Sequence, residues 1–411
     1  MDGAISVNEI ILINVSGEDK PCVVAGLAGI LAQYKVNVLD IGQTSIHDTL
    51  AFGILIEVPE GVDSKPMLND ISNSAKGLNL QVRYTSVSTE EYSLWVSQQG
   101  KPRYIVTLLT RQLDAVQIAK VTDVVTQHGM YIDQIRRLSG RVPLDRLSTK
   151  TSACIEISVR GHSPDVIQLR ADFLELGNEL DIDIAYQEAN MFRRNRRLVA
   201  FDMDSTLIEA EVIDELAKAA GVGEQVAAIT ESAMRGELDF AQSFRKRVSL
   251  LKGLDASVLA EVAKSLRLTE GAEELISILK KLGYRTAILS GGFNYFGKIL
   301  QEKLGIDYVY ANELEIVDGK VTGNVVGTIV DGERKALLLC EIAERENIAL
   351  EQVIAVGDGA NDLPMLSIAG LGVAFRAKPI VKKSAKQSIS NHGLASILYL
   401  LGFSDKEMNK V

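Results

Sequence analysis

Three short apolar stretches, each followed at once by polar residues, constrain the fold of this chain more than any other feature. They are residues 198–201 (LVAF), 284–290 (YRTAILS) and 352–357 (QVIAVG), and long helical patterns separate them. Buried strands that alternate with helices are typical of a mostly parallel sheet covered by helices. From about residue 197 onward we therefore expect an α/β domain of the doubly wound, Rossmann-like class.

A second helical region interrupts this domain between the first two strands. It spans roughly seventy residues, too many for a simple crossover, so we expect a helical cap at approximately 209–272. Residues 308–327 (YVYANELEIVDGKVTGNVVG) predict a hairpin that turns at Asp318-Gly319. An Asp-Gly pair between two apolar runs favours such a turn.

The first half of the chain contains an internal repeat. Residues 9–87 have the pattern of a strand, a helix, two strands, a helix and a strand, and residues 103–188 repeat it. A βαββαβ unit of this size is a small α+β module of the ferredoxin-like type. We expect two such modules, at 1–95 and 96–190, before the α/β domain at 191–411. The loop at 140–151 in the second module is longer and polar.

Charge and composition exclude some classes of partner. The 411 residues carry a net charge of -10, which argues against nucleic acid as the main partner. The basic run RRNRR at 193–197 is interpreted as a solvated linker, because charge runs usually face water. No segment has the length and apolarity of a membrane span, and the first residues lack the pattern of a signal peptide. We expect no membrane partner.

The cysteines indicate a reducing location. Cys22, Cys154 and Cys340 lie far apart, a spacing that suggests neither a zinc site nor a disulfide framework. A cytoplasmic location is therefore expected. Cys340 falls in the apolar stripe of a predicted helix and is expected to pack in the core.

The polar clusters after the three strands should meet. Groups that follow the carboxyl ends of parallel strands converge on one crevice. The clusters are Asp202-Met-Asp204-Ser-Thr, Ser290-Gly-Gly and Asp358-Gly-Ala-Asn361-Asp362, and Lys335 lies on a helix between the last two. Carboxylates suit Mg²⁺, and a hydroxyl-glycine turn with a lysine suits a phosphoryl group. With no His or Cys at a plausible spacing, an aspartate nucleophile is the consistent choice. The alternative is a set of exposed loop acids.

These motifs resemble those of a known superfamily. DMDST (202–206), SGG (290–292) and GDGAND (357–362), with the intervening lysine, are similar to the signature of the haloacid dehalogenase-like (HAD) phosphatases. The segments 204–217 (DSTLIEAEVIDELA) and 234–253 (MRGELDFAQSFRKRVSLLKG) resemble the phosphoserine phosphatase family within it, over residues 197–400. The N-terminal modules are similar in pattern to tandem ACT domains, which sense amino acids.

The resemblance implies a role for each polar residue. Asp202 would be the phosphorylated nucleophile and Asp204 the general acid and base. The Asp202 side chain, the Asp204 backbone carbonyl and Asp358 would hold Mg²⁺. The phosphoryl group would be bound by Ser290, Gly291, Lys335 and Asn361, with Asp362 supporting Lys335.

Substrate recognition is expected in the cap. The family's pattern implies that Glu211 binds an ammonium, that Arg247 binds a carboxylate, and that Met234 and Phe240 form an apolar lid. Phe240 and Arg247 lie at helical spacing and share a face. The implied reaction is hydrolysis of O-phospho-L-serine to L-serine and phosphate through an aspartyl-phosphate (EC 3.1.3.3), the last step of serine biosynthesis.

Two alternatives stay open. One is a HAD phosphatase or phosphotransferase that acts on another small phosphomonoester or on a phosphoprotein. The other is an amino-acid-binding regulator whose catalytic half is vestigial.

The ACT-like modules depart from their family at the effector loop. ACT domains usually have a glycine after the first strand, where Cys22 stands in the first module, and the second module has TRQLDAV (110–116) with no Pro-Gly. Glycine permits close backbone approach and positive φ. An effector such as L-serine is implied by the family. The open sheet edges also favour a homodimer.

Overall fold

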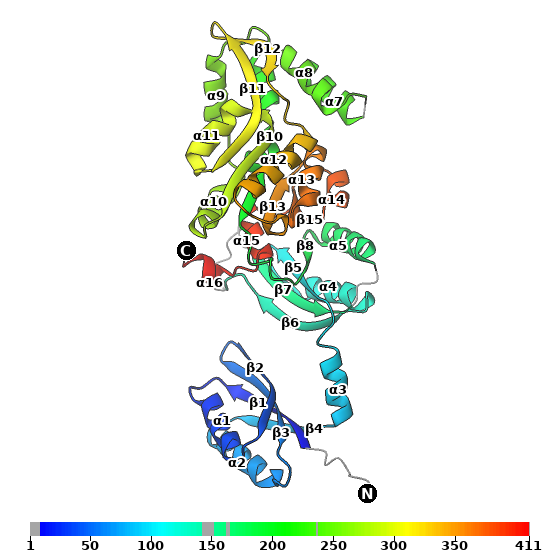
Figure 1. Cartoon of the computed structure of the whole chain (residues 1–411), viewed down its shortest axis with the longest axis vertical. Coiled ribbons are helices and arrows are strands. Elements are labelled where there is room, and N and C mark those ends of the chain that lie inside the picture. The colour runs from blue at the N-terminus through cyan, green and yellow to red at the C-terminus, as the bar shows by residue number, and fades with distance from the viewer. Residues whose placement is uncertain (1–8, 142–151, 162–164, 236, 411) are drawn as a thin grey trace. The chain divides into compact units, whose positions relative to one another are not determined.

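The computed structural model of the chain describes residues 9–141, 152–161, 165–235 and 237–410. Most of the predicted polar loop at 140–151 lies outside these residues. The chain forms two compact units, Met1–Lys101 and Pro102–Val411 (Figure 1).

The first unit contains a four-stranded antiparallel sheet with the strand order β2-β3-β1-β4. Its elements are β1 (Glu9–Glu18), α1 (Val23–Gln33), β2 (Asn37–Ile46), β3 (Thr49–Val58), α2 (Ser64–Gly77), β4 (Gln81–Val87) and α3 (Thr89–Ser97). Alternate residues of the strands and one face of each of α1 and α2 form its apolar core. The predicted order of elements is confirmed, except that α3 was not anticipated.

Two local features of this unit explain where helices begin. Cys22 precedes α1 with φ 73°, in the left-handed region that favours the glycine usual at this position. Helix α3 begins with a capping box, in which Ser88 and Glu91 each bond the other's backbone amide. The domain boundary predicted at residue 95 falls within α3 and stays a proposal.

The second unit opens with a sheet of the same design. Its order is β6-β7-β5-β8, which corresponds strand for strand to the first sheet. The elements are β5 (Arg103–Thr110), α4 (Ala115–Gln127), β6 (Tyr131–Arg137), β7 (Ala153–Arg160), α5 (Val166–Leu180) and β8 (Asp183–Glu188). The predicted βαββαβ repeat is therefore confirmed.

The same unit continues into a seven-stranded sheet ordered β12-β11-β10-β9-β13-β14-β15. All neighbouring strands are parallel except β11 and β12, which form the predicted antiparallel hairpin. The strands are β9 (Leu198–Phe201), β10 (Arg285–Phe293), β11 (Tyr308–Val317), β12 (Lys320–Val326), β13 (Val353–Gly357), β14 (Leu371–Phe375) and β15 (Gln387–Ile389). The α/β fold class is confirmed.

Helices cover both faces of this sheet. Val199 and Phe201 of β9 pack on one face with α10 (Ala272–Lys281) and α11 (Asn294–Leu304). Leu198 and Ala200 pack on the other face with α12 (Gly332–Arg345) and α13 (Leu363–Ile368). Successive strand residues point to opposite faces, so a strand covered on both sides is apolar throughout, as the LVAF segment is.

Four helices between β9 and α10 form the cap: α6 (Val212–Ala219), α7 (Gly223–Met234), α8 (Phe240–Ser249) and α9 (Ser257–Ser265). The chain enters and leaves the cap side by side, because Ile208 and Leu268 pair as an antiparallel bridge. The cap also bonds the hairpin, where the Gly253 amide donates to the Val321 carbonyl at 2.8 Å. The cap therefore has two attachments to the α/β core.

The interpretation of residues 193–197 as a solvated linker was wrong for two of its arginines. Arg193 and Arg196 are each only 7% exposed. Arg193 pairs with Glu156 of β7 at 2.6 Å and donates to the Leu400 carbonyl at 3.1 Å. Arg196 donates to the carbonyl of Glu351. Each guanidinium is buried because it bonds acceptors that lie far away in the sequence.

Arg193 belongs to an extensive contact between the second module and the α/β core. The side chain of Gln387 on β15 bonds both the amide and the carbonyl of Tyr186 on β8, as a neighbouring strand would. Gln187 donates to the Leu400 carbonyl at 2.9 Å. Residues 102–411 therefore form one compact unit, and the separate domain predicted at 96–190 stays a proposal.

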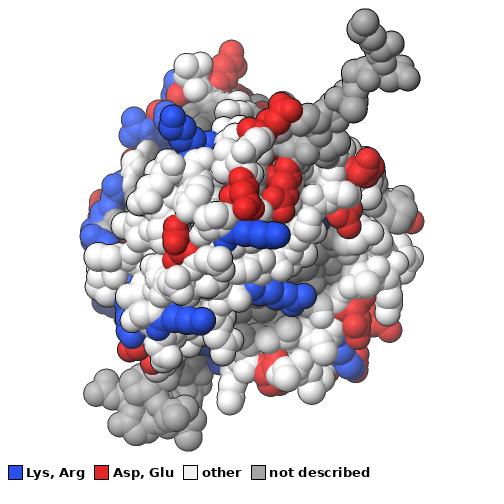
Figure 2. Space-filling model, turned by 90° about the horizontal axis from the view of Figure 1, so that it is seen from below, with Lys and Arg blue, Asp and Glu red and all other residues white. Residues whose placement is uncertain are grey.

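The structure also tests the predictions for Cys340 and for membrane-spanning segments. Cys340 is exposed, so its predicted place in the core was wrong: the apolar stripe of α12 runs through Leu338, Leu339 and Ile342 instead. No helix within the described residues could cross a membrane. Acidic and basic side chains are interspersed over the face that Figure 2 shows.

Candidate active site

The strand register brings the three polar clusters to one edge of the sheet. Strand β9 lies between β10 and β13, and Phe201 pairs with Ile288 on one side and with Val356 on the other. The residues just beyond these three strand positions are therefore neighbours. Ligands bind at such a switch point of an open α/β sheet, outside the carboxyl ends of the strands.

A buried lysine joins two carboxylates at this point. Lys335, in the first turn of α12, lies 2.8 Å from Asp202 and 2.7 Å from Asp362. Burial alone would lower the pKa of Lys335, but the two carboxylates outweigh it and raise the pKa. Burial, together with the charge of Asp202, raises the pKa of Asp362 to about 7. The lysine is thus a fixed positive charge at the end of β9.

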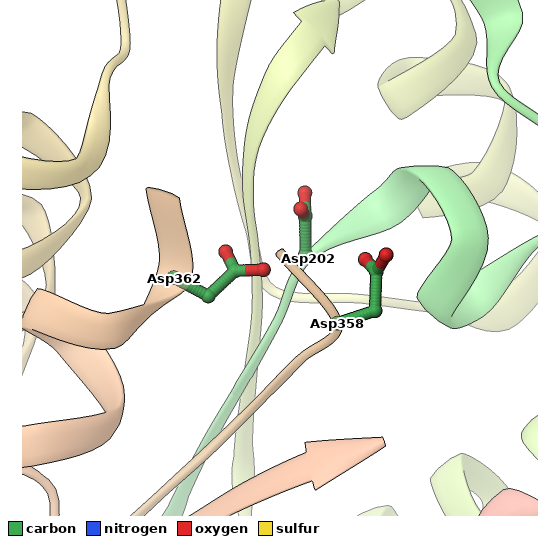
Figure 3. A group of neighbouring side chains, drawn as sticks. All are labelled: Asp202, Asp358 and Asp362. Carbon is green, nitrogen blue, oxygen red and sulfur yellow. The ribbon is translucent and has the colours of Figure 1, made fainter. Parts of the chain in front are cut away.

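Asp202, Asp358 and Asp362 form a carboxylate cluster. One oxygen from each lies within 4.8 Å of the others: Asp202 follows β9, whereas Asp358 and Asp362 both belong to the segment after β13 (Figure 3). Burial, followed by the charge of Asp202, raises the pKa of Asp358 to about 8. Thr206 donates to Asp358 at 3.3 Å. Crowded oxygen donors of this kind suit a hard divalent cation, so the cluster is consistent with a metal site.

The loop after β9 encloses Asp204. Ser205 has φ 54° in this loop, and Asp204 accepts from the amide of Val212 at the start of α6, at 3.3 Å. A Cβ on Gly292 would come within 2.3 Å of an Asp204 oxygen, so any larger residue there would displace the Asp204 carboxyl. Burial, then the charges of Glu211 and Asp202, raises the pKa of Asp204 well above its usual range.

The segment Ser290–Gly292 forms a turn within β10. The Ser290 hydroxyl accepts from the amide of Gly292 at 2.9 Å. A Cβ on Gly291 would lie 2.6 Å from Cζ of Phe240, so the cap ring lies directly on this glycine. Phe240 and Phe244 are stacked with their centroids 6.0 Å apart, as their helical spacing predicts. Aromatic rings of the cap therefore cover the Ser290–Gly292 turn.

Two charged residues of the cap lie near these groups. Glu211 accepts from the Ser205 hydroxyl at 2.7 Å, just before α6. Arg247 on α8 is partly buried, and its Nε has no hydrogen-bond partner among the described residues. Burial lowers the pKa of Arg247, whereas the nearby carboxylates of Glu211 and Asp214 act to raise it. A buried donor without a partner requires an explanation, and a bound anion would supply one.

The remaining predicted residues are only partly described. Asn361 is partly buried, and its amide oxygen would lie 2.2 Å from a Cβ on Gly359, so it lies against that glycine. Met234 ends α7, but its side chain lies outside the described residues.

The sequence analysis assigned no role to two buried polar residues at this site, although one of them, Thr206, lies within the DMDST motif. Thr206 contacts Asp358, and Asn312 on β11 bonds the Gly291 carbonyl at 2.8 Å. Asn312 is a polar residue in the strand next to β10, near its parallel section. The rule that found the other clusters, a polar group following an apolar strand, could have found it.

Comparison with known proteins agrees with this geometry. A family model for haloacid dehalogenase-like hydrolases matches residues 199–367, and a model for the ACT domain matches residues 9–85. The parallel sheet, the cap and the acidic site are thus those of a HAD-like hydrolase that carries an ACT domain.

Similarity to individual proteins identifies the family within the HAD-like hydrolases. The chain is 41% identical over 399 residues to the phosphoserine phosphatase of Streptomyces coelicolor, covering 97% of this chain and 93% of that protein. It is 38% identical over 400 residues to the phosphoserine phosphatase of Mycobacterium tuberculosis, covering 97% and 94%. A probable phosphoserine phosphatase from Vibrio cholerae, solved without ligand, has a TM-score of 0.58 at 35% identity, covering 76% and 90%. The chain belongs to the phosphoserine phosphatase family.

Proposed function

We propose that this protein hydrolyses O-phospho-L-serine to L-serine and phosphate through an aspartyl-phosphate, as the last step of serine biosynthesis. The observation that carries the proposal is the placement of Asp202 against buried Lys335, beside protonatable Asp204 and an Arg247 whose Nε has no hydrogen-bond partner among the described residues. The first two arrangements suit phosphoryl transfer. The third suits a substrate that also carries a carboxylate.

The proposed chemistry divides between two aspartates. An oxygen of Asp202 attacks phosphorus, and the bond from phosphorus to the serine oxygen breaks as Asp204 donates its proton to that oxygen. A water then attacks the phospho-aspartate while Asp204 takes back a proton, which releases phosphate and restores Asp202. The raised pKa of Asp204 supports this role, because the group must hold a proton in the first step.

The other groups would bind the transferring phosphoryl group. Lys335 offers a fixed charge, held between Asp202 and Asp362. Ser290, the backbone of Gly291 and Asn361 would offer hydrogen-bond donors. Such preorganised donors stabilise the charge that develops on the equatorial oxygens.

We propose Mg²⁺ as the metal, held by Asp202, Asp358 and the backbone carbonyl of Asp204. Bound there, it would neutralise phosphoryl charge. The carboxylate cluster supports this, because Mg²⁺ prefers oxygen ligands and shares its coordination with water and phosphate.

Metal removal gives a direct test. Protein stripped with EDTA should be inactive and regain activity with Mg²⁺. At about 100 times its Kd, Mg²⁺ should add roughly 2.7 kcal/mol to the free energy of unfolding, which raises the Tm of a unit of this size by about 4 °C. The carboxylates with raised pKa values destabilise the metal-free fold increasingly as pH rises from 4 to 8. The rise in Tm, measured by scanning calorimetry, should therefore be larger at pH 8 than at pH 5. Full activity in EDTA would contradict the metal proposal.

Specificity for phosphoserine is proposed to reside in the cap. Glu211 would bind the ammonium and Arg247 the carboxylate, while Phe240 and Met234 exclude water. The contact of Phe240 with Gly291 supports a lid at this place.

Variants of the charged pair test specificity. Arg247→Ala and Glu211→Gln should each lower kcat/KM for phosphoserine roughly tenfold to a hundredfold, because each removes a charged hydrogen bond. The same variants should change kcat/KM for p-nitrophenyl phosphate little. Arg245→Ala on the exposed face of α8 is the matched control. Equal losses on both substrates would favour the alternative, a phosphatase or phosphotransferase for another phosphomonoester or phosphoprotein.

Regulation and assembly are further proposals. The ACT match supports an amino-acid effector such as L-serine, and exposed apolar residues on the edge strand β2, among them Ile41 and Ile46, support a homodimer. Measuring the size of the protein in solution with and without L-serine tests both the effector and the homodimer.

We also propose a cytoplasmic location, supported by the three free cysteines.

A further inference from the structure

Asn312 is bonded at both ends of its side-chain amide. It lies on β11 and is only 2% exposed. Its Nδ2 donates to the Gly291 carbonyl at 2.8 Å, and its Oδ1 accepts from the Val330 amide at 2.8 Å. Neither partner is close in sequence, so the side chain connects two separate segments of the site.

The first bond closes an irregularity of the sheet. Leu289 pairs with Tyr310 and Phe293 with Asn312, so three residues of β10, Ser290–Gly292, face one residue of β11. A bulge of this kind removes backbone groups from the ladder. The partly buried Gly291 carbonyl then needs another partner, and Asn312 supplies it.

This bond fixes the direction of one peptide group. The carbonyl of Gly291 and the N–H of Gly292 belong to the same planar trans peptide and point in opposite directions. With the carbonyl held by Asn312, the N–H points to the Ser290 hydroxyl, 2.9 Å away. The Gly292 position is also adjacent to the Asp204 carboxyl. Asn312 thus keeps the Gly292 N–H on the Ser290 hydroxyl oxygen, which leaves the Ser290 O–H free to donate to a phosphoryl group.

The second bond reaches the helix of the buried lysine. Val330 precedes Asp331, which caps α12 by accepting from the Arg334 amide at 2.9 Å. Lys335 lies one residue further along the same first turn. One side chain therefore ties the Ser290–Gly292 turn to the start of the lysine helix.

We propose that Asn312 is a positioning residue for phosphoryl transfer. It holds the Gly291–Gly292 peptide and the start of α12 in fixed relation, so that the Ser290 hydroxyl, which this peptide orients, and Lys335 meet the same phosphoryl oxygens. The inference rests on the proposed function, because it assumes that the Ser290–Gly292 turn binds the phosphoryl group.

Asn312→Asp isolates the donor half of the side chain. The aspartate keeps the size and the acceptor for Val330, but it places an oxygen against the Gly291 carbonyl, and the peptide should rotate away. Because loss of one oxyanion donor costs about 100-fold to 1,000-fold, misaiming one should lower kcat roughly tenfold to a hundredfold. The loss should be equal for phosphoserine and p-nitrophenyl phosphate, with KM nearly unchanged. The Ki of orthovanadate should rise by a similar factor.

The control is Asn178→Asp on the exposed surface of α5, which should leave all three readouts unchanged. If the aspartate variant does not fold, Asn312→Ser replaces it in the experiment. The serine hydroxyl is too short to reach the Gly291 carbonyl, so we expect the same loss of kcat. A kcat within about twofold of the unmodified enzyme, or a loss confined to phosphoserine, overturns the proposal. If the unmodified enzyme turns over only p-nitrophenyl phosphate, the proposed function fails, yet the test of Asn312 stands.

Discussion

Replacing Asp202 with asparagine should lower kcat for phosphoserine by a factor on the order of 10⁴–10⁶, the scale seen when a covalent nucleophile is removed. The amide cannot form the acyl phosphate. It also lacks the charge that Lys335 meets at 2.8 Å. Rapid quenching of the unmodified enzyme with labelled phosphoserine should trap label on the protein, and the variant should trap none.

The fold of the variant should survive, because Lys335 keeps its second partner, Asp362, at 2.7 Å. Circular dichroism and a thermal melt verify this. Asp123→Asn, on the exposed face of α4, is a matched control that should leave kcat unchanged. Turnover by Asp202→Asn above a hundredth of the normal kcat would exclude Asp202 as the nucleophile.

Much of the fold could be predicted because each half of the chain has a strong local pattern. The LVAF segment is apolar without interruption, which only a strand covered on both faces explains. The hairpin at Asp318-Gly319 and the order of strands and helices over residues 9–87 follow from turn and periodicity signals. Helix α3 was missed since it has no buried face, and its capping box was the available signal.

What the sequence could not predict depends on contacts between distant residues. Arg193 and Arg196 belong to a charge run that usually faces water, yet acceptors from β7 and the C-terminal segment surround Arg193. Nothing near them in sequence indicates this burial. The same holds for Gln387, whose side chain bonds the edge strand β8.

The candidate site also has features that the sequence predicted and features that it could not predict. The rule on strand ends brought Asp202, Ser290 and Asp358 together from positions more than 150 residues apart. It could not indicate that Lys335 would be shared between two carboxylates, or that Asn312 would close the bulge at Gly291. These are properties of side-chain geometry, which one-dimensional spacing does not contain.

The second large effect is expected from replacing Lys335, the lysine that lies between two carboxylates. Lys335→Met keeps the length of the side chain and removes its charge, and kcat should fall about 10²–10³-fold because a fixed donor to the phosphoryl group is lost. Stability should fall as well, by about 3–5 kcal/mol, since breaking a buried ion pair leaves carboxylates without a partner. The loss of stability should be smaller at pH 5 than at pH 8, because protonation of a carboxylate relieves the repulsion.

The two losses can be separated with one further substitution. Lys335→Met/Asp362→Asn removes a carboxylate together with the lysine, so the repulsion between Asp202 and Asp362 disappears and much of the lost Tm should return. Activity should not return, because no ammonium group remains at this position to meet the phosphoryl oxygens. Melting curves and kcat for the single and double variants, all with Mg²⁺ present, make the comparison. If activity recovers along with Tm, then the lysine acts only by balancing Asp202 and Asp362 in the fold; if Tm alone recovers, its charge acts in the reaction itself.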